Sequence, residues 1–366
     1  MRRSLSLLLA SVLAIAVPPS IALAQTIQEM AGQMIVVGFK GDGANDASVK
    51  AVRQAVEDGR IGGVMYLKIN VASKAAVTAM NEAFRAAAPD GLPPFLTLDQ
   101  EGGAVERLTE AIGFRELPNA EAVARSDSPA EAEKLYERMA KDIRALGFSV
   151  NFGPVADMNV NRNNQIIAKF GRAFSADPEV VTQYDRAFIE AHHSAGLVTA
   201  LKHFPGHGSS TGDSHAGFVD ITKTWKPEEL EPYKALISGG YKDFVMVGHL
   251  YQGEIQDADD KRPASLSPEW IEGKLRGELG FDGAVISDDL EMGAIRKLYS
   301  LEQTVIGAVN AGTDVLLFSN TAYNDPKLPD RILDVLLSES NRDPAFAKRI
   351  ENSYRRIREL KGRIGH

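Results

Sequence analysis

Short apolar runs recur along the chain, and longer stretches with apolar residues at helical spacing separate them. There are eight such runs, and most of them are near-continuous and rich in β-branched residues, which is typical of parallel strands buried on both faces. The pattern therefore predicts eight strands, at Met34–Phe39, Gly62–Leu67, Phe95–Asp99, Val150–Ala156, Val198–His203, Phe244–His249, Ala284–Asp289 and Asp314–Ser319.

The intervening amphipathic stretches predict helices at Asp46–Asp58, Ser73–Ala88, Ser128–Leu146, Pro178–Ala195 and Leu301–Ala311. Strand–helix alternation over this length predicts one α/β domain, a (β/α)₈ barrel. A doubly wound open sheet is the alternative fold. No predicted strand is followed by a G-x-G-x-x-G turn, which disfavours a dinucleotide-binding version of that sheet.

The first residues of the chain have the three parts of a secretory signal peptide. Arg2 and Arg3 precede an apolar run from Leu5 to Val17, and Ala22-Leu23-Ala24 has the small-x-small pattern of a cleavage site. The apolar run is shorter than the roughly 20 residues that span a bilayer. We therefore expect cleavage after Ala24, a barrel domain over residues 25–366, no membrane span in the mature protein, and a periplasmic or secreted location.

Composition removes several classes of function. The chain has no cysteine, which excludes disulfides, thiolate metal sites and a cysteine nucleophile. The formal net charge is −8, and it becomes more negative once the two leader arginines are lost. An acidic balance argues against a nucleic-acid partner. The basic closing helix, predicted at Asp343–Gly362, is interpreted as a solvated face with i,i+4 pairs to Glu351 and Glu359.

Polar residues end four of the predicted strands, where the active site of a barrel lies. They are Asp99, Lys202-His203, His249 and Ser287-Asp288-Asp289. We expect Asp288 to project into a polar pocket. Asp289 points the other way in a strand, and we assign it as the N-cap of a helix predicted at Leu290–Lys297.

The loop after the fifth predicted strand holds His203, His207 and His215. A metal site on His203 and His207 is disfavoured, because Pro205 and Gly206 prevent the helix that an i,i+4 ligand pair needs, although a loop can also fold around a metal. The alternative pairs Asp213 with His215, so that a carboxylate fixes the tautomer of a general acid/base. Spacing alone leaves an ordinary surface loop equally open.

Six motifs occur together in this chain: DQEGGAVERL (99–108), FGRAFSADP (170–178), KHFPGHGSSTGDSH (202–215), PASLS (263–267), ISDDLEM (286–292) and AGTDVLLF (311–318). In this order they resemble glycoside hydrolase family 3, especially its single-domain β-N-acetylglucosaminidase branch, which is associated with peptidoglycan recycling. The resemblance spans about residues 28–320. It implies a barrel enzyme that removes terminal non-reducing β-linked N-acetylglucosamine with retention of configuration.

Carried over by motif position, the resemblance implies that Asp288 is the nucleophile, His215 an unusual acid/base and Asp213 its partner. Positions that the family uses to hold the sugar correspond to Asp99, Arg107, Arg172, Lys202 and His203. Lys202 and Arg172 are also expected to lower the pKa of nearby carboxylates and keep Asp288 ionised. No metal or organic cofactor is needed. The expected partner is a small carbohydrate, either a peptidoglycan fragment or a chitooligosaccharide, and we expect a monomer.

Other functions stay open on sequence alone. A β-glucosidase of the same family is one, although the chain lacks the second domain of the family's larger β-glucosidases. A glycoside phosphorylase is another, because a histidine acid/base does not repel phosphate as a carboxylate does. Less favoured are a non-catalytic periplasmic carbohydrate-binding protein and a metal-dependent hydrolase built on His203, His207, Asp213 and His215.

Overall fold

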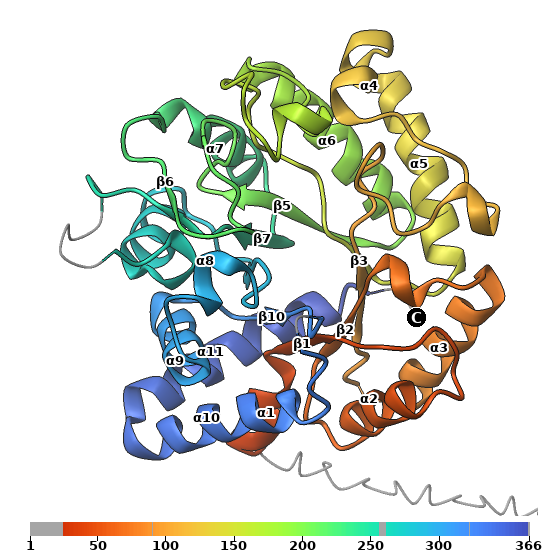
Figure 1. The fold of residues 1–366 in the computed structure, drawn as a ribbon, viewed down its shortest axis with the longest axis vertical. Helices are drawn as coiled ribbons and strands as arrows, with labels where there is room; N and C mark the ends of the chain where they lie inside the picture. The colour runs from red at the N-terminus through yellow and green to blue at the C-terminus, as the bar shows by residue number, and fades with distance from the viewer. Residues whose placement is uncertain (1–24, 90, 256–260, 322, 365–366) are drawn as a thin grey trace, which may run out of the picture.

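The computed structural model describes residues 25–89, 91–255, 261–321 and 323–364, so the predicted leader, residues 1–24, lies outside the described residues. Eight parallel strands form a barrel with helices around it (Figure 1). The predicted fold class is therefore confirmed. The barrel strands are β1 Ile35–Gly38, β2 Gly63–Tyr66, β3 Phe95–Leu98, β4 Val150–Asn151, β5 Val198–Phe204, β7 Phe244–Val247, β9 Ala284–Ser287 and β10 Leu316–Phe318.

Neighbouring strands follow the order β10-β1-β2-β3-β4-β5-β7-β9. The barrel closes between β9 and β10 through a parallel bridge from Ile286 to Val315, and the Ser287 N–H donates to the Val315 carbonyl over 3.0 Å. Because every barrel pair is parallel, all the carboxyl ends of the strands lie at one end of the barrel.

Each predicted strand corresponds to an observed one, but β4 is shorter than predicted. Regular pairing stops at Asn151, whereas the apolar run continues to Ala156. Pro154 lies inside that run and has no N–H to donate to a neighbouring strand. The backbone beyond Asn151 instead makes irregular bonds to β5, such as Ala200 N–H to the Gly153 carbonyl over 2.7 Å.

Helices surround the barrel (Figure 1). They are α1 Ile27–Gln33, α2 Ala47–Glu57, α3 Lys74–Ala86, α4 Ala120–Ser126, α5 Pro129–Ala145, α6 Pro178–Ser194, α7 Glu231–Ser238, α8 Gly293–Arg296, α9 Leu301–Ala311, α10 Leu328–Arg342 and α11 Pro344–Lys361. The predicted starts of α3 and α9 agree with the structure, because a side chain at each start caps the helix. Ser73 accepts from the Ala76 N–H, and Ser300 and Gln303 form a capping box.

Some elements were not predicted from the sequence, most of them short. These are α1, α4, α7, α10, a π-helix at Glu269–Glu278, and the two-stranded sheet of β6 Val219–Asp220 and β8 Leu250–Tyr251.

The interpretation of α11 as a solvated basic face is wrong in part. Lys348 does make a surface pair with Glu351, but Arg356 donates to the buried Asp314 carboxylate over 3.2 Å. Lys361 is itself buried, and its ammonium donates to the Gln33 side chain and the Gly62 carbonyl. The basic residues of α11 therefore also fasten the helix to the barrel.

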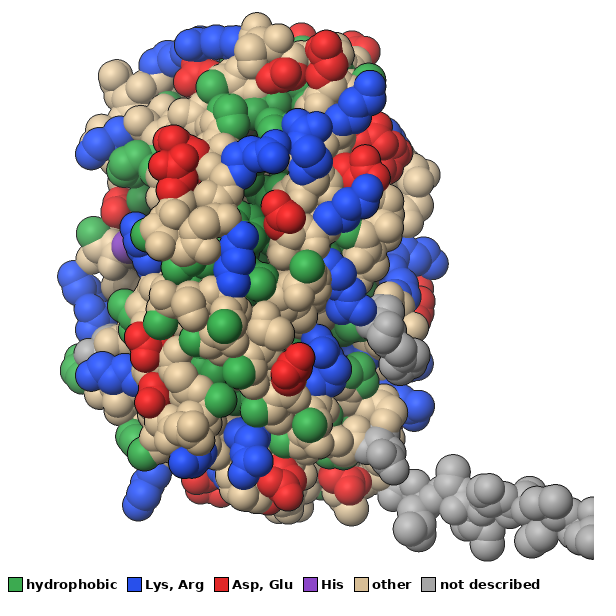
Figure 2. Space-filling model, turned by 90° about the vertical axis from the view of Figure 1, so that its right-hand side faces the viewer, with side chains coloured by type: hydrophobic (Ala, Val, Ile, Leu, Met, Phe, Trp, Pro, Cys, Tyr) green, Lys and Arg blue, Asp and Glu red, His purple; other side chains and the backbone are tan. Residues whose placement is uncertain are grey.

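The face drawn in Figure 2 carries lysine and arginine interspersed with aspartate and glutamate, so the negative net charge is not gathered into one patch there. Along the part of the chain that the structure describes, no helix combines the length and the apolar character needed to cross a membrane.

Candidate active site

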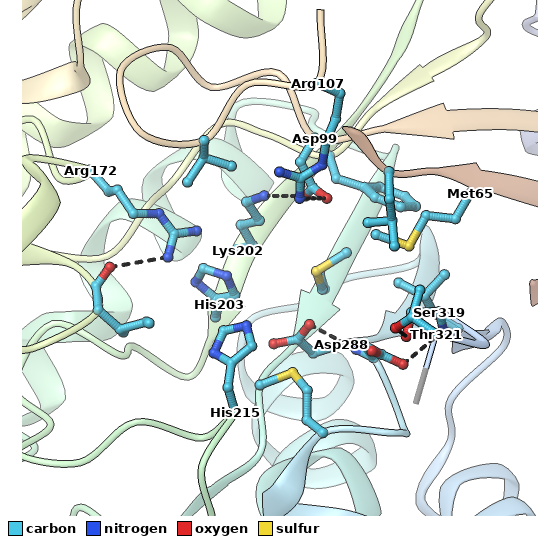
Figure 3. A pocket seen from close by; sticks show the side chains of 18 of the residues that line it. Met65, Asp99, Arg107, Arg172, Lys202, His203, His215, Asp288, Ser319 and Thr321 are labelled. Carbon is cyan, nitrogen blue, oxygen red and sulfur yellow. Dashed lines mark hydrogen bonds and ion pairs between the residues drawn. The ribbon is translucent and has the colours of Figure 1, made fainter. Parts of the chain in front are cut away.

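A cavity of about 400 Å³ lies at the carboxyl ends of the strands. Of the residues singled out from the sequence, those that line it are Asp99, Arg107, Arg172, Lys202, His203, His215, Asp288 and Asp289. Asp213 does not line the cavity, but its carboxylate contacts the His215 ring. Figure 3 shows the His215 imidazole beside the Asp288 carboxylate, with Lys202, Asp99 and Arg107 gathered on another side of the same space.

Asp99 follows β3 directly, and Lys202 lies within β5, which brings both side chains to the same end of the barrel. The Lys202 ammonium is almost fully buried and lies 2.8 Å from an oxygen of Asp99 and 2.6 Å from an oxygen of Glu101. Arg107 binds the other oxygen of Asp99 over 2.9 Å. Asp99 is thus fixed by two cations at the cavity wall.

Glu101 is a site residue that the sequence reasoning missed. The Arg172 guanidinium grips its carboxylate with two bonds of 2.8 Å, from Nε to Oε2 and from Nη2 to Oε1. Such bidentate pairing fixes the plane of the guanidinium and the plane of the carboxylate relative to each other. Glu101 lies two positions after Asp99. In an extended segment, side chains two positions apart point to the same side, so this spacing could have placed Glu101 beside Asp99.

The contacts with Lys202, Arg107 and Arg172 determine the charge of the Asp99 and Glu101 carboxylates. Burial would raise the pKa of Asp99, but Lys202 and Arg107 outweigh it and the pKa is lowered. Burial acts in the same way on Glu101, and Arg172 and Lys202 hold its pKa well below the usual range. Both carboxylates are therefore ionised, and three cations face two anions in this part of the cavity wall.

Asp288 follows β9 and is partly exposed to the cavity. Desolvation alone would raise its pKa, but His203, His249 and His215 lower it to about 2. The expectation that Lys202 and Arg172 keep this group ionised is wrong, because those cations are occupied with Asp99 and Glu101. Asp288 is an anion throughout the neutral pH range.

Asp289 has a different role from the predicted helix cap. The helix begins only at Gly293, and Met292 precedes it as the N-cap residue. Asp289 Oδ1 instead accepts from the N–H groups of Glu291 and Ser319, so it ties the turn after β9 to the end of β10. The prediction failed because the cap preference of aspartate does not distinguish a helix from an isolated turn.

Asp213 and His215 form the predicted pair. Asp213 Oδ1 lies 2.8 Å from His215 Nδ1, and it also accepts from the His215 backbone N–H over 2.9 Å. Both side chains remain accessible, with exposed fractions of 35% and 61%. With Nδ1 bound to Asp213, Nε2 is the nitrogen left to exchange a proton with a group in the cavity.

His203 and His207 are held by protein partners. The buried Asp157, which the sequence reasoning missed, lies 2.7 Å from His203 Nδ1 and accepts from the His207 backbone N–H. The His207 ring contacts the hydroxyls of Ser210 and Ser214, and burial lowers its pKa to about 4. Among the described residues, no group of three histidine or acidic side chains is arranged to hold a metal ion.

A second hollow of about 260 Å³ continues from the cavity past His215. His215, Asp289, Met292, Ser319 and Thr321 line both spaces. Glu291 and Arg296 line only the second, which we call the outer groove. His215 therefore stands where the inner cavity passes into the outer groove.

Comparison with known proteins gives consistent matches. The glycosyl hydrolase family 3 N terminal domain matches residues 26–360. A beta-hexosaminidase of Xylella fastidiosa is 37% identical over 78% of this chain and 82% of that protein. A beta-hexosaminidase of Stenotrophomonas maltophilia is 36% identical over 79% of this chain and 83% of that protein.

Two solved structures share the fold closely. A glycoside hydrolase family 3 beta-N-acetylglucosaminidase from Paenibacillus superposes with a TM-score of 0.84 and 32% identity, over 93% of this chain and 63% of that longer chain. A beta-N-acetylhexosaminidase from Beutenbergia cavernae gives a TM-score of 0.83 and 28% identity, over 93% of this chain and 99% of that one.

Proposed function

This chain belongs to glycoside hydrolase family 3, and we propose that this glycoside hydrolase is a retaining exo-β-N-acetylglucosaminidase. The observation that carries the proposal is the pairing of an ionised Asp288 in the cavity with the Asp213–His215 pair at its rim. The names of the relatives support N-acetylhexosamine as the sugar.

The inner cavity would receive the terminal sugar. Asp99 has each oxygen fixed by a cation, and its remaining lone pairs suit the hydroxyls of a pyranose ring. Lys202, Arg107, Arg172 and His203 line the same space and offer donors. A cavity of about 400 Å³ ringed by side chains favours binding of one terminal residue over binding within a long chain.

The first chemical step would form a bond between an Asp288 oxygen and the anomeric carbon while the glycosidic C–O bond breaks. The proton on His215 Nε2 passes to the departing oxygen, so the leaving group departs as a neutral alcohol. In the second step His215 takes a proton from water, and the resulting oxygen attacks the anomeric carbon and breaks the ester to Asp288. Asp213 accepts from Nδ1 throughout and stabilises the imidazolium whenever it forms.

The direct test is Asp288→Ala. Loss of the nucleophile should reduce hydrolysis of 4-nitrophenyl N-acetyl-β-glucosaminide by at least about 10⁴-fold. Asp334→Ala, an exposed aspartate on α10, is the matched control and should keep wild-type turnover. Proton NMR of the first product should show the β-anomer.

An inverted product, or wild-type turnover by Asp288→Ala, would contradict the mechanism. Faster turnover of the glucoside than of the N-acetylglucosaminide would instead support a β-glucosidase. Formation of the sugar 1-phosphate in phosphate buffer would support a phosphorylase.

We further propose that the leaving group occupies the outer groove and comes from peptidoglycan. The two carboxylates of the groove already accept from protein donors: Asp289 from two backbone N–H groups, and Glu291 from Ser319 Oγ and Thr321 N–H. Arg296 has no carboxylate partner among the described residues, and its guanidinium lies beside the exposed ring of Tyr323. A cation here suits the lactyl carboxylate of N-acetylmuramic acid.

Matched disaccharides test this assignment. N-acetylglucosaminyl-N-acetylmuramic acid and chitobiose differ only in the lactyl group of the leaving sugar. Arg296→Gln should raise KM about 5- to 10-fold for the first and leave chitobiose within about 2-fold, because one charged hydrogen bond is lost. Arg342→Gln, an exposed arginine on α10, is the control. Equal increases of KM for both disaccharides would show that Arg296 does not bind the lactyl carboxylate.

A further inference from the structure

Three consecutive carbonyl oxygens of the loop that carries His215 are bound by one short segment, residues 293–297. The Gly293 N–H donates to the His215 carbonyl and the Ala294 N–H to the Ser214 carbonyl, both over 3.1 Å. The Lys297 ammonium donates to the Ala216 carbonyl over 2.7 Å. This segment begins five residues after Asp288 in the chain.

The contact is close enough to require a glycine. A Cβ on Gly293 would lie 2.6 Å from the His215 carbonyl oxygen and 2.7 Å from that of Ala216. Both distances are well inside van der Waals contact, and both partners are backbone atoms that cannot rotate away. Any side chain at position 293 therefore has to push the loop outward.

The Ser214 hydroxyl lies 3.1 Å from His207 Nε2, and beyond that contact little else among the described residues fixes the position of the His215 side chain. Its ring bonds to Asp213, but Asp213 belongs to the same loop and can orient the imidazole only relative to that loop. The earlier part of the loop is held separately, by Asp157 at His207 and by Asn164, whose amide donates to the carbonyls of His207 and Ser210. The segment 293–297 is thus the support that holds the backbone of His215 itself, and it acts beside the contact between Ser214 and His207.

We propose that residues 293–297 form a latch that sets the place of the acid/base relative to the nucleophile, with Lys297 as a positioning residue. The proposal rests on the proposed roles of Asp288 and His215. One continuous stretch of chain, from Asp288 to Lys297, carries the nucleophile at its start and holds the acid/base loop at its end. The positions of the proposed nucleophile and of the proposed acid/base therefore depend on the same segment of the chain.

A displaced imidazole affects only substrates that need its proton. Chitobiose must leave as an alcohol, so its departure depends on proton transfer from His215. A 2,4-dinitrophenyl N-acetylglucosaminide releases a stable phenolate and needs no acid. The parameter kcat/KM reports the first irreversible step, which is formation of the sugar–Asp288 bond. The ratio of kcat/KM between the two substrates therefore measures the placement of His215.

The experiment compares Gly293→Ala and Lys297→Met with the wild type. For chitobiose, kcat/KM should fall about 100-fold in Gly293→Ala, because a shift of about 1 Å in a catalytic group has effects of that size. It should fall about 5- to 10-fold in Lys297→Met, which loses one hydrogen bond. Both variants should stay within about 3-fold of wild type on the dinitrophenyl substrate. Lys297→Arg keeps a donor and should recover most of the loss.

Matched controls exclude general damage. Gly307→Ala on α9 places a Cβ at an ordinary 3.7 Å from Leu266, and Lys348→Met removes an exposed lysine on α11. Both should behave as wild type on both substrates.

Equal losses on the two substrates in the latch variants, or no loss on chitobiose, would overturn the latch while leaving the hydrolase assignment intact. A wild-type enzyme that releases N-acetylglucosamine from neither substrate would overturn the proposed function and the latch together.

Discussion

At the scale of single residues, the cavity wall is defined by charges that compensate one another. Lys202 contacts both Asp99 and Glu101, while Arg107 and Arg172 each bind one of these carboxylates. An uncompensated charge in such a place is costly, so removal of one member leaves its partner strongly destabilised. Each of these pairs is therefore costly to break, and together they hold the cavity-facing atoms in fixed positions.

Glu101→Gln tests this residue-scale view. The variant leaves Arg172 and Lys202 short of one anion in a buried setting, and the free energy of unfolding in urea should fall by about 3 kcal/mol. Glu121→Gln removes the anion of a pair with Arg125 whose guanidinium is largely exposed, and should cost at most about 1 kcal/mol. Equal changes in the two variants would show that burial adds nothing to the Glu101 pair.

At the scale of elements, α11 closes the amino end of the barrel opposite the cavity. Its last residue, Lys361, reaches Gln33 at the end of α1 and Gly62 at the start of β2, and lies 4.7 Å from the centre of the Phe95 ring. Burial lowers the pKa of Lys361 from its usual value near 10.5 to about 7. The helix is thus fastened by a group whose charge changes near neutral pH.

The stability of the wild type relative to Lys361→Met should depend on pH in one direction. Because the pKa is lower in the folded chain, the unfolded state binds more protons between about pH 7 and pH 10. The free energy of unfolding of the wild type should therefore rise with pH relative to the variant, by at most about 1.4 kcal/mol per pH unit. Urea denaturation of both proteins at pH 7, 8 and 9 measures this difference in the free energy of unfolding.

Lys141→Met, which removes an exposed lysine on α5, is the control and should show no such slope against the wild type. A difference between wild type and Lys361→Met that stays flat from pH 7 to pH 9 would mean that Lys361 remains charged in the folded barrel.

At the scale of the whole molecule, the two ends of the barrel have separate tasks. Helices α1 and α11 pack together at one end, whereas the long loops after β3, β4, β5 and β9 meet at the other. Changes at the amino end should therefore alter stability with little effect on KM, whereas changes at the carboxyl end should alter turnover, and stability as well where a buried ion pair is broken.

We also propose that the whole protein is exported after removal of its leader. Expressed in its own host, the mature chain should begin at Gln25, contain 342 of the 366 residues and be released with the periplasmic fraction or the medium. Intact-mass spectrometry and cell fractionation check this. Retention of an uncleaved chain starting at Met1 in the cytoplasm would contradict the proposal. An Ala24→Pro variant, which blocks a small-residue cleavage site, should retain the leader.

The sequence by itself was sufficient for the eight strands, six helices and the titratable side chains that line the cavity. Strand and helix periods are local, and a residue such as Asp288 needs only its place after an apolar run to be assigned to the barrel mouth. The Asp213–His215 pair is equally local, since a turn of two residues makes it.

Only the tertiary structure decided which distant groups meet. Glu101 and Arg172 are 71 positions apart, and Asp157 reaches His203 across 46. His203 in β5 and His249 after β7, together with His215, lower the pKa of Asp288, and residues 293–297 fasten the loop at 214–216. These relations depend on distances between loops brought together by barrel closure, and no spacing along one segment encodes such a distance.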